Sequence, residues 1–274
     1  MVVRRHDLII KNGQVSDGSG TSRKKADVGI EEDQIKTIGN LSGYRADVFV
    51  DASNRIVGPS FIDVHTHDDH ALLSAPGMSF KTSQGVTTVV VGNCGISLAP
   101  LRLVGDRPPA PLDLLRDGYN FPRMADFVDH LEATPPATKA AYLCGHTTLR
   151  VGAMENLMCP ATEDEISLVK DNLSEALDSG AVGLSTGLAY DPAKSAPPRE
   201  ILSLAEILGP ADALYTAHPR SESANVIESL VKASLIGRES GAAVVVSHHK
   251  VKGKENISRS LETFELIDRV RKDQ

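Results

Sequence analysis

Residues 1–57 alternate apolar and polar positions in short runs, a pattern typical of β-strands joined by turns. The pairs Asn12-Gly13 and Glu32-Asp33 each stand between two apolar segments, and we predict a hairpin turn at each of them. The segment lacks the apolar spacing of an amphipathic helix. It is therefore predicted to form a small β-sheet module that precedes the main domain.

The pattern changes after this module. Six strand-like apolar runs alternate with segments of helical periodicity, which favours βα units and a parallel sheet. The runs cover residues 59–67, 85–94, 139–150, 180–188, 212–220 and 241–250. The clearest helix begins after Thr162, where Glu165 completes a capping-box spacing, and it ends near Gly180. Two further helices are predicted over 226–238 and 261–270.

Reactive side chains stand at the ends of most of these runs. They are His65, His67, Cys94, His146, His218, His248 and His249. Repeated βα units fit either a doubly wound open sheet or a barrel. Polar residues at successive strand ends are typical of a barrel active site, whereas a nucleotide-binding open sheet would need a glycine-rich turn that the sequence lacks. We predict an α/β fold, a (β/α)8 TIM-type barrel over residues 58–274 with about six βα units, preceded by the strands of residues 1–57.

Composition narrows the classes of function. The chain has 274 residues, of which 41% are hydrophobic and 24% charged, as in ordinary globular proteins. The net charge of −7 argues against a nucleic-acid partner. Three cysteines without regular spacing do not make a disulfide framework, which favours a reducing, cytoplasmic location. We find no signal-peptide pattern and no continuous apolar span, so no membrane partner is expected.

Two histidines at the end of the first run raise the question of a metal site. If His65 and His67 lie two apart on a strand, they point to the same side, which in a barrel is the interior. Taken alone, they fit a solvated pair as well as a pair of metal ligands. Cys94 favours the metal site, because it stands between Asn and Gly at a strand end and not within an apolar run.

Further imidazoles would reach the same cavity from the last two runs. His218 ends the fifth run, and either His248 or His249 ends the sixth. A thiolate together with imidazoles favours zinc over magnesium or calcium. The competing interpretation is that each histidine is satisfied by structural hydrogen bonds, and four strand ends supplying N and S ligands make it the weaker one.

With these residues identified, the sequence resembles the amidohydrolase superfamily, and within it the N-acyl-D-amino-acid deacylases, or D-aminoacylases. The motifs are GPSFIDVHTHDD (58–69), GVTTVVVGNCGISLAP (85–100), GHTTLR (145–150), GLSTGLAYDP (183–192), HPRSE (218–222) and SHHK (247–250). They span nearly the whole chain. The resemblance implies a metal-dependent barrel beside a β-sandwich built partly from the N-terminal strands. It also implies hydrolysis of the amide bond of an N-acyl-D-amino acid to a carboxylate and a free D-amino acid.

The resemblance also implies a ligand set. In the family, one zinc ion is held tightly by a cysteine and two histidines, which match Cys94, His218 and His248 in this sequence. The pair His65 and His67 would contribute to a second, weaker metal position.

Substrate-binding residues follow from the same resemblance. Lys250 matches a lysine that binds the substrate carboxylate, and Tyr190 matches a substrate-contacting position. On a strand, His248 and Lys250 would both face the interior and His249 the helix layer. His146 would either line the site or make a structural hydrogen bond.

The catalytic aspartate of the family has no counterpart in the sequence. In that family an aspartate at the end of the eighth strand is both general base and general acid. The 217 residues after residue 57 (274 − 57) fall short of the roughly 250 of a typical barrel, and only six strands are predicted. This aspartate is therefore expected beyond residue 274. The chain is predicted to be a fragment or a truncated product, poorly soluble and with little or no deacylase activity by itself.

Three interpretations of function stay open. The first is a zinc-dependent D-aminoacylase, of which this chain is the N-terminal portion. The second is a non-catalytic zinc-binding remnant or interaction protein. The third is a domain whose strand-end residues are structural and which binds some other small molecule. Hydantoinases and dihydroorotases resemble the chain at the His-x-His motif. They carry a carboxylated lysine at the end of the fourth strand, however, and residues 180–188 contain no lysine. Hydrolysis of cyclic amides is therefore the weaker alternative.

Overall fold

The computed structural model describes residues 5–102, 110–115 and 120–273. The chain divides into two compact units, Met1–Phe61 and Ile62–Gln274, and the division falls four residues (61 − 57) beyond the boundary expected from the sequence. Within the described residues, no helix has both the length and the apolar character that a membrane span requires.

The first unit is a single mixed β-sheet in its described residues. Its strands are β1 (Arg5–Val15), β2 (Lys24–Glu31), β3 (Gln34–Gly39), β4 (Arg45–Asp51) and β5 (Ile56–Val57). They are ordered β3-β2-β1-β4, and β5 pairs with the end of β1. The β1–β2 and β2–β3 pairs are antiparallel, whereas β4 and β5 run parallel to β1. This sheet is the N-terminal β-structure that the alternating pattern predicts.

One of the two predicted turns is correct and the other is wrong. Glu32 and Asp33 join the antiparallel strands β2 and β3, as predicted. At Asn12-Gly13 the chain does not turn; β1 continues through it, and its pairing with β2 shifts there. Asn12 adopts a left-handed φ of 63° and its Nδ2 donates to Asp51 Oδ1 at 3.0 Å. Asn tolerates this conformation in a bulge as well as in a turn, which is why the sequence signal is ambiguous.

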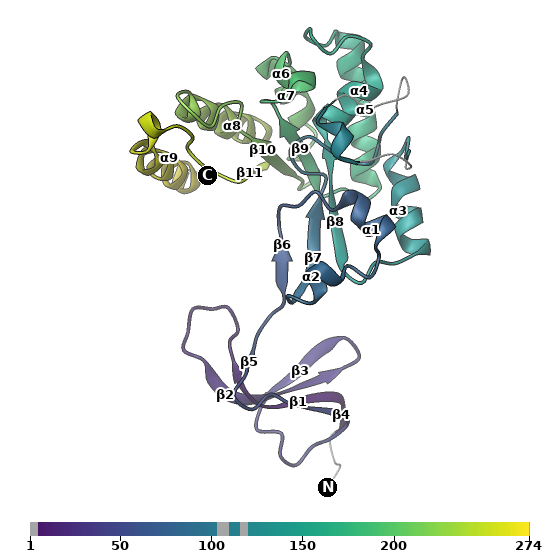
Figure 1. Ribbon diagram of the computed structural model, residues 1–274, viewed down its shortest axis with the longest axis vertical. Coiled ribbons are helices and arrows are strands. Elements are labelled where there is room, and N and C mark those ends of the chain that lie inside the picture. The colour runs from purple at the N-terminus through teal and green to yellow at the C-terminus, as the bar shows by residue number, and fades with distance from the viewer. Residues whose placement is uncertain (1–4, 103–109, 116–119, 274) are drawn as a thin grey trace. The chain divides into compact units, whose positions relative to one another are not determined.

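The second unit contains the six predicted strands in one curled parallel sheet (Figure 1). These are β6 (Phe61–Asp63), β7 (Val86–Val91), β8 (Lys139–Gly145), β9 (Gly183–Gly187), β10 (Leu214–His218) and β11 (Ala243–Val246). Their order in the sheet is their order in the chain, β6 to β11. The pairs from β7 to β11 are parallel, so the carboxyl ends of the strands meet at one edge. This is the predicted barrel fold, present as six of its strands.

Helices connect the strands, as βα units require. They are α1 (Asp69–Ser74), α2 (Ser79–Thr82), α3 (Met124–Ala133), α4 (His146–Ala153), α5 (Glu163–Asp178), α6 (Asp191–Lys194), α7 (Pro198–Ala205), α8 (Val226–Ser240) and α9 (Arg259–Asp273). Short 3-10 turns occupy Leu112–Leu115 and Lys254–Asn256. The predicted capping box of α5 is present, and Gly180 and Gly241 end α5 and α8 with φ of 93° and 72°.

The core of this unit lies between the sheet and its helices. The strands contribute buried apolar residues such as Val89, Leu184 and Tyr215, and α5 and α7 contribute Leu173 and Leu204. The β-branched run of β7 fits a parallel sheet with buried positions, whereas β11 lies at the edge of the sheet and none of its residues is buried. This packing fixes the strand ends, where the reactive side chains of the sequence are located.

Candidate metal centre

The His-x-His segment follows β6. This strand ends at Asp63, so the expectation that His65 and His67 lie on the strand is wrong. Their rings nevertheless lie close together, with centroids 5.7 Å apart. Lys81 of α2 holds both ends of the segment, because its Nζ lies 2.6 Å from Asp63 Oδ2 and 3.0 Å from Asp68 Oδ2. Ion pairs, and not strand alternation, therefore position the two histidines.

Cys94 lies in the tight loop that follows β7. Its side chain is 1% exposed and its backbone has a left-handed φ of 56°. The side chain of Ser185 in β9 holds this loop with two hydrogen bonds. It accepts one from the Gly95 N–H at 2.9 Å and donates one to the Gly92 carbonyl at 2.5 Å. A Cβ at Gly187 would lie 2.1 Å from the Cys94 carbonyl oxygen, so glycine is required where β9 meets this loop.

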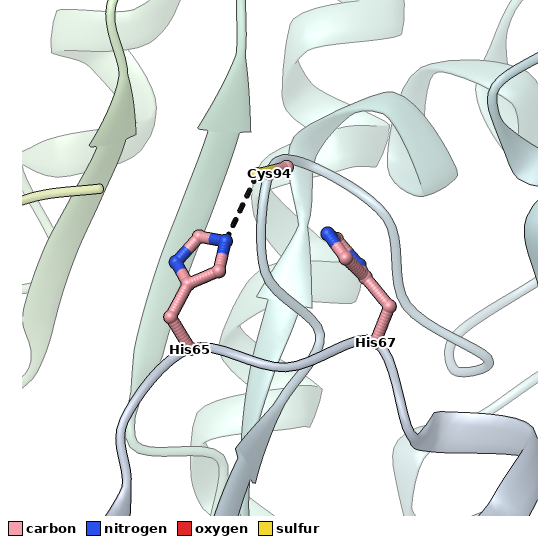
Figure 2. Close-up of side chains that lie close together, drawn as sticks. All are labelled: His65, His67 and Cys94. Atoms are coloured by element: carbon pink, nitrogen blue, oxygen red, sulfur yellow. Dashed lines mark hydrogen bonds between the residues drawn. The ribbon is translucent and has the colours of Figure 1, made fainter. Parts of the chain in front are cut away.

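Three residues from three strand ends surround one point. Cys94 Sγ lies 3.4 Å from His218 Nδ1 and 3.4 Å from His248 Nε2, and these two nitrogens are 2.9 Å apart. His65 also reaches Cys94, with its Nε2 3.3 Å from Cys94 Sγ, the contact that the dashed line in Figure 2 marks. His67 also points toward Cys94 in that view. The structure thus brings together all five predicted ligands.

The last strand differs from the sequence expectation. β11 ends at Val246, so His248, His249 and Lys250 lie beyond it, and His248 has a φ of 34°. Their directions are nevertheless those expected: His248 faces Cys94, whereas the His249 ring lies against Phe264 of α9, with ring centroids 5.2 Å apart. His248 and His249 therefore point in the directions that strand alternation predicts, although they lie outside the strand.

The spacing of the donor atoms fits a metal ion. Two groups could hold one, His65-His67-Cys94 and Cys94-His218-His248, and in each group the ligand atoms lie within 4.8 Å of one another. Tetrahedral zinc bonds of about 2.0 Å to nitrogen and 2.3 Å to sulfur place neighbouring ligand atoms roughly 3.3–3.5 Å apart. The two sides of the triangle from Cys94 Sγ to His218 and to His248 are 3.4 Å and lie in this range, whereas the side of 2.9 Å between the two nitrogens is shorter. Because Cys94 belongs to both groups, it could join two metal positions.

Two histidines of the site are uncharged at neutral pH, as binding of a cation requires. Burial, reinforced by the neighbouring His248, lowers the pKa of His65 and of His218 to about 4. Both imidazoles are therefore neutral at pH 7 and offer a lone pair. Burial raises the pKa of Cys94 to about 11, so its thiol keeps its proton in the metal-free protein. Binding a cation would displace the proton of Cys94.

A cavity of about 500 Å³ opens beside His218 and His248. Tyr190 and Lys250 both line it. The Tyr190 hydroxyl is 3.3 Å from His218 Nδ1, and burial together with the neighbouring Cys94 raises its pKa to about 12. Lys250 Nζ is 2.5 Å from Glu222 Oε1 and 2.9 Å from His248 Nδ1. Both predicted substrate-binding residues thus lie where a molecule could meet the metal ligands.

His146 does not line this cavity. It is fully buried, and its Nε2 lies 3.0 Å from Glu200 Oε1, so the structural alternative is correct for this residue. Glu200 also pairs with the buried Arg150, whose Nε donates to the Pro192 carbonyl at 2.9 Å. We call His146, Arg150 and Glu200 the buried cluster. Burial alone would raise the pKa of Glu200, but His146 and Arg150 outweigh it and lower this pKa to about 2.

Sequence reasoning gave no role to Glu222. This residue is 6% exposed and faces Lys250, Lys252 and His248. Its position four residues after His218 was visible, but its partners lie about thirty residues further along, and no spacing rule connects them.

Comparison with known proteins identifies the family. A family model described as "Amidohydrolase family" matches residues 48–209. The chain belongs to the amidohydrolase family. This confirms the resemblance found in the motifs and, with the parallel sheet described above, the predicted barrel fold.

Individual members of this family share more than 40% of their residues with the chain. The chain is 48% identical to a D-aminoacylase of Alcaligenes xylosoxydans xylosoxydans and 44% identical to its N-acyl-D-glutamate deacylase, over 96% and 97% of the chain. A crystal structure of N-acyl-D-glutamate deacylase from Bordetella bronchiseptica, complexed with zinc and a phosphonate mimic of the tetrahedral intermediate, superimposes with a TM-score of 0.95 at 41% identity. That match covers 98% of this chain and 57% of the other. The chain spans about half the length of the curated relatives, 54% of each of these two.

Proposed function

We propose that this chain supplies the metal centre and part of the substrate cavity of a zinc-dependent enzyme that hydrolyses N-acyl-D-amino acids to a carboxylate and a free D-amino acid. The observation that carries this proposal is the triangle of Cys94, His218 and His248, whose two sides from Cys94 Sγ suit tetrahedral zinc. The similarity to D-aminoacylase and to two N-acyl-D-amino-acid deacylases supports the substrate class.

The residues would divide the work as follows. Cys94, His218 and His248 hold the zinc ion, and His65 with His67 supply a second, weaker position. When bound, zinc polarises a carbonyl oxygen and lowers the pKa of a coordinated water from about 15.7 to about 7.

Substrate would be oriented by the polar lining of the cavity. Lys250 presents its ammonium group to the cavity and binds the carboxylate of the amino acid. The Tyr190 hydroxyl, next to His218 and at the wall of the cavity, contacts the substrate. Glu222 is engaged by Lys250 and Lys252 and is not a free base. The general base and acid would be an aspartate, as the family resemblance implies.

The alternative is a zinc-binding protein without turnover. Both hypotheses predict bound zinc, and they differ in activity. Cyclic-amide hydrolysis has less support: the L-hydantoinase of Arthrobacter aurescens shares the fold, with a TM-score of 0.51, at only 15% identity. In addition, β9, Gly183–Gly187, carries no lysine to be carboxylated.

A direct test is the hydrolysis of N-acetyl-D-amino acids and of their L-enantiomers by the zinc-loaded protein. Preparations of residues 1–274 and of any longer product of the same reading frame should be compared. We expect D-selective turnover in a product that includes the strand-end aspartate, and little or none in residues 1–274. Equal turnover of both enantiomers would contradict the substrate class, and full turnover by residues 1–274 would contradict the need for the aspartate.

A further inference from the structure

Glu222 lies next to His218 and His248, on the side of each ring that faces away from Cys94. Its Oε1 is 3.1 Å from His248 Nδ1 and 3.8 Å from His218 Nε2. The opposite nitrogens of the two rings, His248 Nε2 and His218 Nδ1, are those that face Cys94. One buried carboxylate therefore stands on the far side of both imidazoles.

Glu222 also holds the segment that carries His248. Residues 247–253 follow β11 and precede the 3-10 turn at Lys254, so neither a strand nor a helix fixes their place. Glu222 binds this segment through its carboxylate, 2.5 Å from Lys250 Nζ and 2.5 Å from Lys252 Nζ. Its backbone carbonyl accepts a hydrogen bond from the Lys252 N–H at 2.5 Å. We call Glu222, His248, Lys250 and Lys252 the site cluster.

The proton on His248 has two arrangements, and only one allows Nε2 to bind a metal ion. Lys250 Nζ lies 2.9 Å from His248 Nδ1. If Nδ1 accepts a hydrogen bond from Lys250, the ring proton is on Nε2, which then has no lone pair for a metal ion. If Nδ1 carries the proton toward Glu222, Nε2 offers its lone pair on the side of Cys94. A carboxylate next to Nδ1 favours the second arrangement, because it accepts a hydrogen bond from the Nδ1–H and also balances the charge of Lys250.

We propose that Glu222 is a positioning residue of the metal centre: it fixes the tautomer and orientation of His248, and it keeps Lys250 and Lys252 at the cavity without leaving their charges unbalanced beside the metal ion. This inference rests on the proposed zinc centre. It adds to the ligand set a residue that does not touch the metal, and it explains how a segment outside the sheet supplies a ligand.

The test is the zinc dissociation constant of Glu222→Gln, measured by competition with a chelator at a temperature where every variant is folded by circular dichroism. Removing such a carboxylate typically weakens metal binding about 10- to 100-fold, and we expect a loss in this range. Glu228→Gln on α8 is the matched control: it makes the same change to a glutamate that pairs only with the exposed Lys232, and its zinc affinity should equal that of the unchanged protein.

Two further variants separate positioning from a general structural role. Lys252→Met removes one partner of Glu222 but leaves its approach to His248, so zinc affinity should change less than threefold. Glu222→Asp keeps the charge and should recover part of the affinity that Glu222→Gln loses; it also serves if Glu222→Gln fails to fold. A loss in Lys252→Met as large as that in Glu222→Gln would overturn the role assigned to the histidine contacts.

Nitrogen-15 chemical shifts of the histidine rings give a second readout. In the metal-free protein we expect the Nδ1-protonated tautomer of His248, and its loss in Glu222→Gln. Zinc affinity and tautomer that are both unchanged in Glu222→Gln would overturn the inference. If the protein without any substitution binds no zinc, the proposed function fails. This result differs from a failure of the inference alone, in which the protein binds zinc but Glu222→Gln changes neither the affinity nor the tautomer.

Discussion

The second unit contains two clusters in which a glutamate meets a histidine and a basic side chain, and they differ in what surrounds them. In the buried cluster, His146, Arg150 and Glu200 are closed off from solvent, and Arg150 also donates to the carbonyls of Pro192 and Cys159. In the site cluster, Lys250 and Lys252 are partly exposed and line a cavity of about 500 Å³ beside the metal ligands. The same residue types thus join helices in one place and prepare a binding site in the other.

The difference shows what a carboxylate–histidine contact means in this fold. In the buried cluster, every polar partner belongs to the scaffold: α4 supplies the histidine and arginine, and α7 supplies the glutamate. In the site cluster, the glutamate faces histidines whose other nitrogens meet Cys94. Disrupting the first should therefore lower stability, whereas disrupting the second should lower metal affinity.

The largest expected effect concerns the buried cluster. Glu200→Ala leaves the fully buried Arg150 without its carboxylate, and removing one member of a buried ion pair costs about 3–5 kcal/mol. Urea unfolding measures the loss. Glu206→Ala is the control, because Glu206 pairs with Lys170 at the surface and such pairs contribute about 1 kcal/mol or less. Equal losses in the two variants would remove the distinction between buried and exposed pairs.

The pH dependence of stability sharpens the same comparison. Because the pKa of Glu200 is lowered from 4.5 to about 2 in the folded state, the unfolded chain binds more protons between these values. Glu200 therefore contributes stability above about pH 4.5 that is lost as the pH falls toward 2, up to about 3 kcal/mol. Unfolding free energies at pH 5 and pH 3 should show this decrease. Glu200→Gln should show a smaller decrease, and an unchanged slope in this variant would contradict the account.

The smallest effect is expected at Tyr190. Its hydroxyl lies 3.3 Å from His218 Nδ1, the nitrogen that faces Cys94 and that is assigned to the metal. A neutral hydrogen bond contributes only about 0.5–1.5 kcal/mol, and this contact competes with the metal ion. Tyr190→Phe should therefore change the zinc dissociation constant less than tenfold in chelator competition. A loss as large as that of Glu222→Gln would make Tyr190 part of the metal centre.

The sequence predicts what depends on local pattern. The six apolar runs, the capping box at Thr162 and Glu165, and the gathering of Cys94, His218 and His248 at one edge of the sheet all follow from periodicity and strand polarity. The motifs also lead to the correct family. These features are encoded within a few residues of where they occur.

Contacts between distant segments are what the sequence could not supply. Asn12-Gly13 fits a bulge and a turn equally, and only the pairing partner decides between them. Glu200 lies 54 residues after His146, and Glu222 lies 28 residues before Lys250, so neither pairing follows from a local pattern. His248 likewise lies beyond β11 and next to Glu222, in a segment to which strand alternation does not apply.

The most direct test of the central claim is the zinc content of Cys94→Ala compared with Cys144→Ala. Both cysteines are buried, and burial raises the pKa of each thiol, but only Cys94 lies among the histidines. Purified protein should contain tightly bound zinc in the unchanged and Cys144→Ala forms and lose it in Cys94→Ala. Equal zinc content in all three forms would contradict a metal centre built on Cys94.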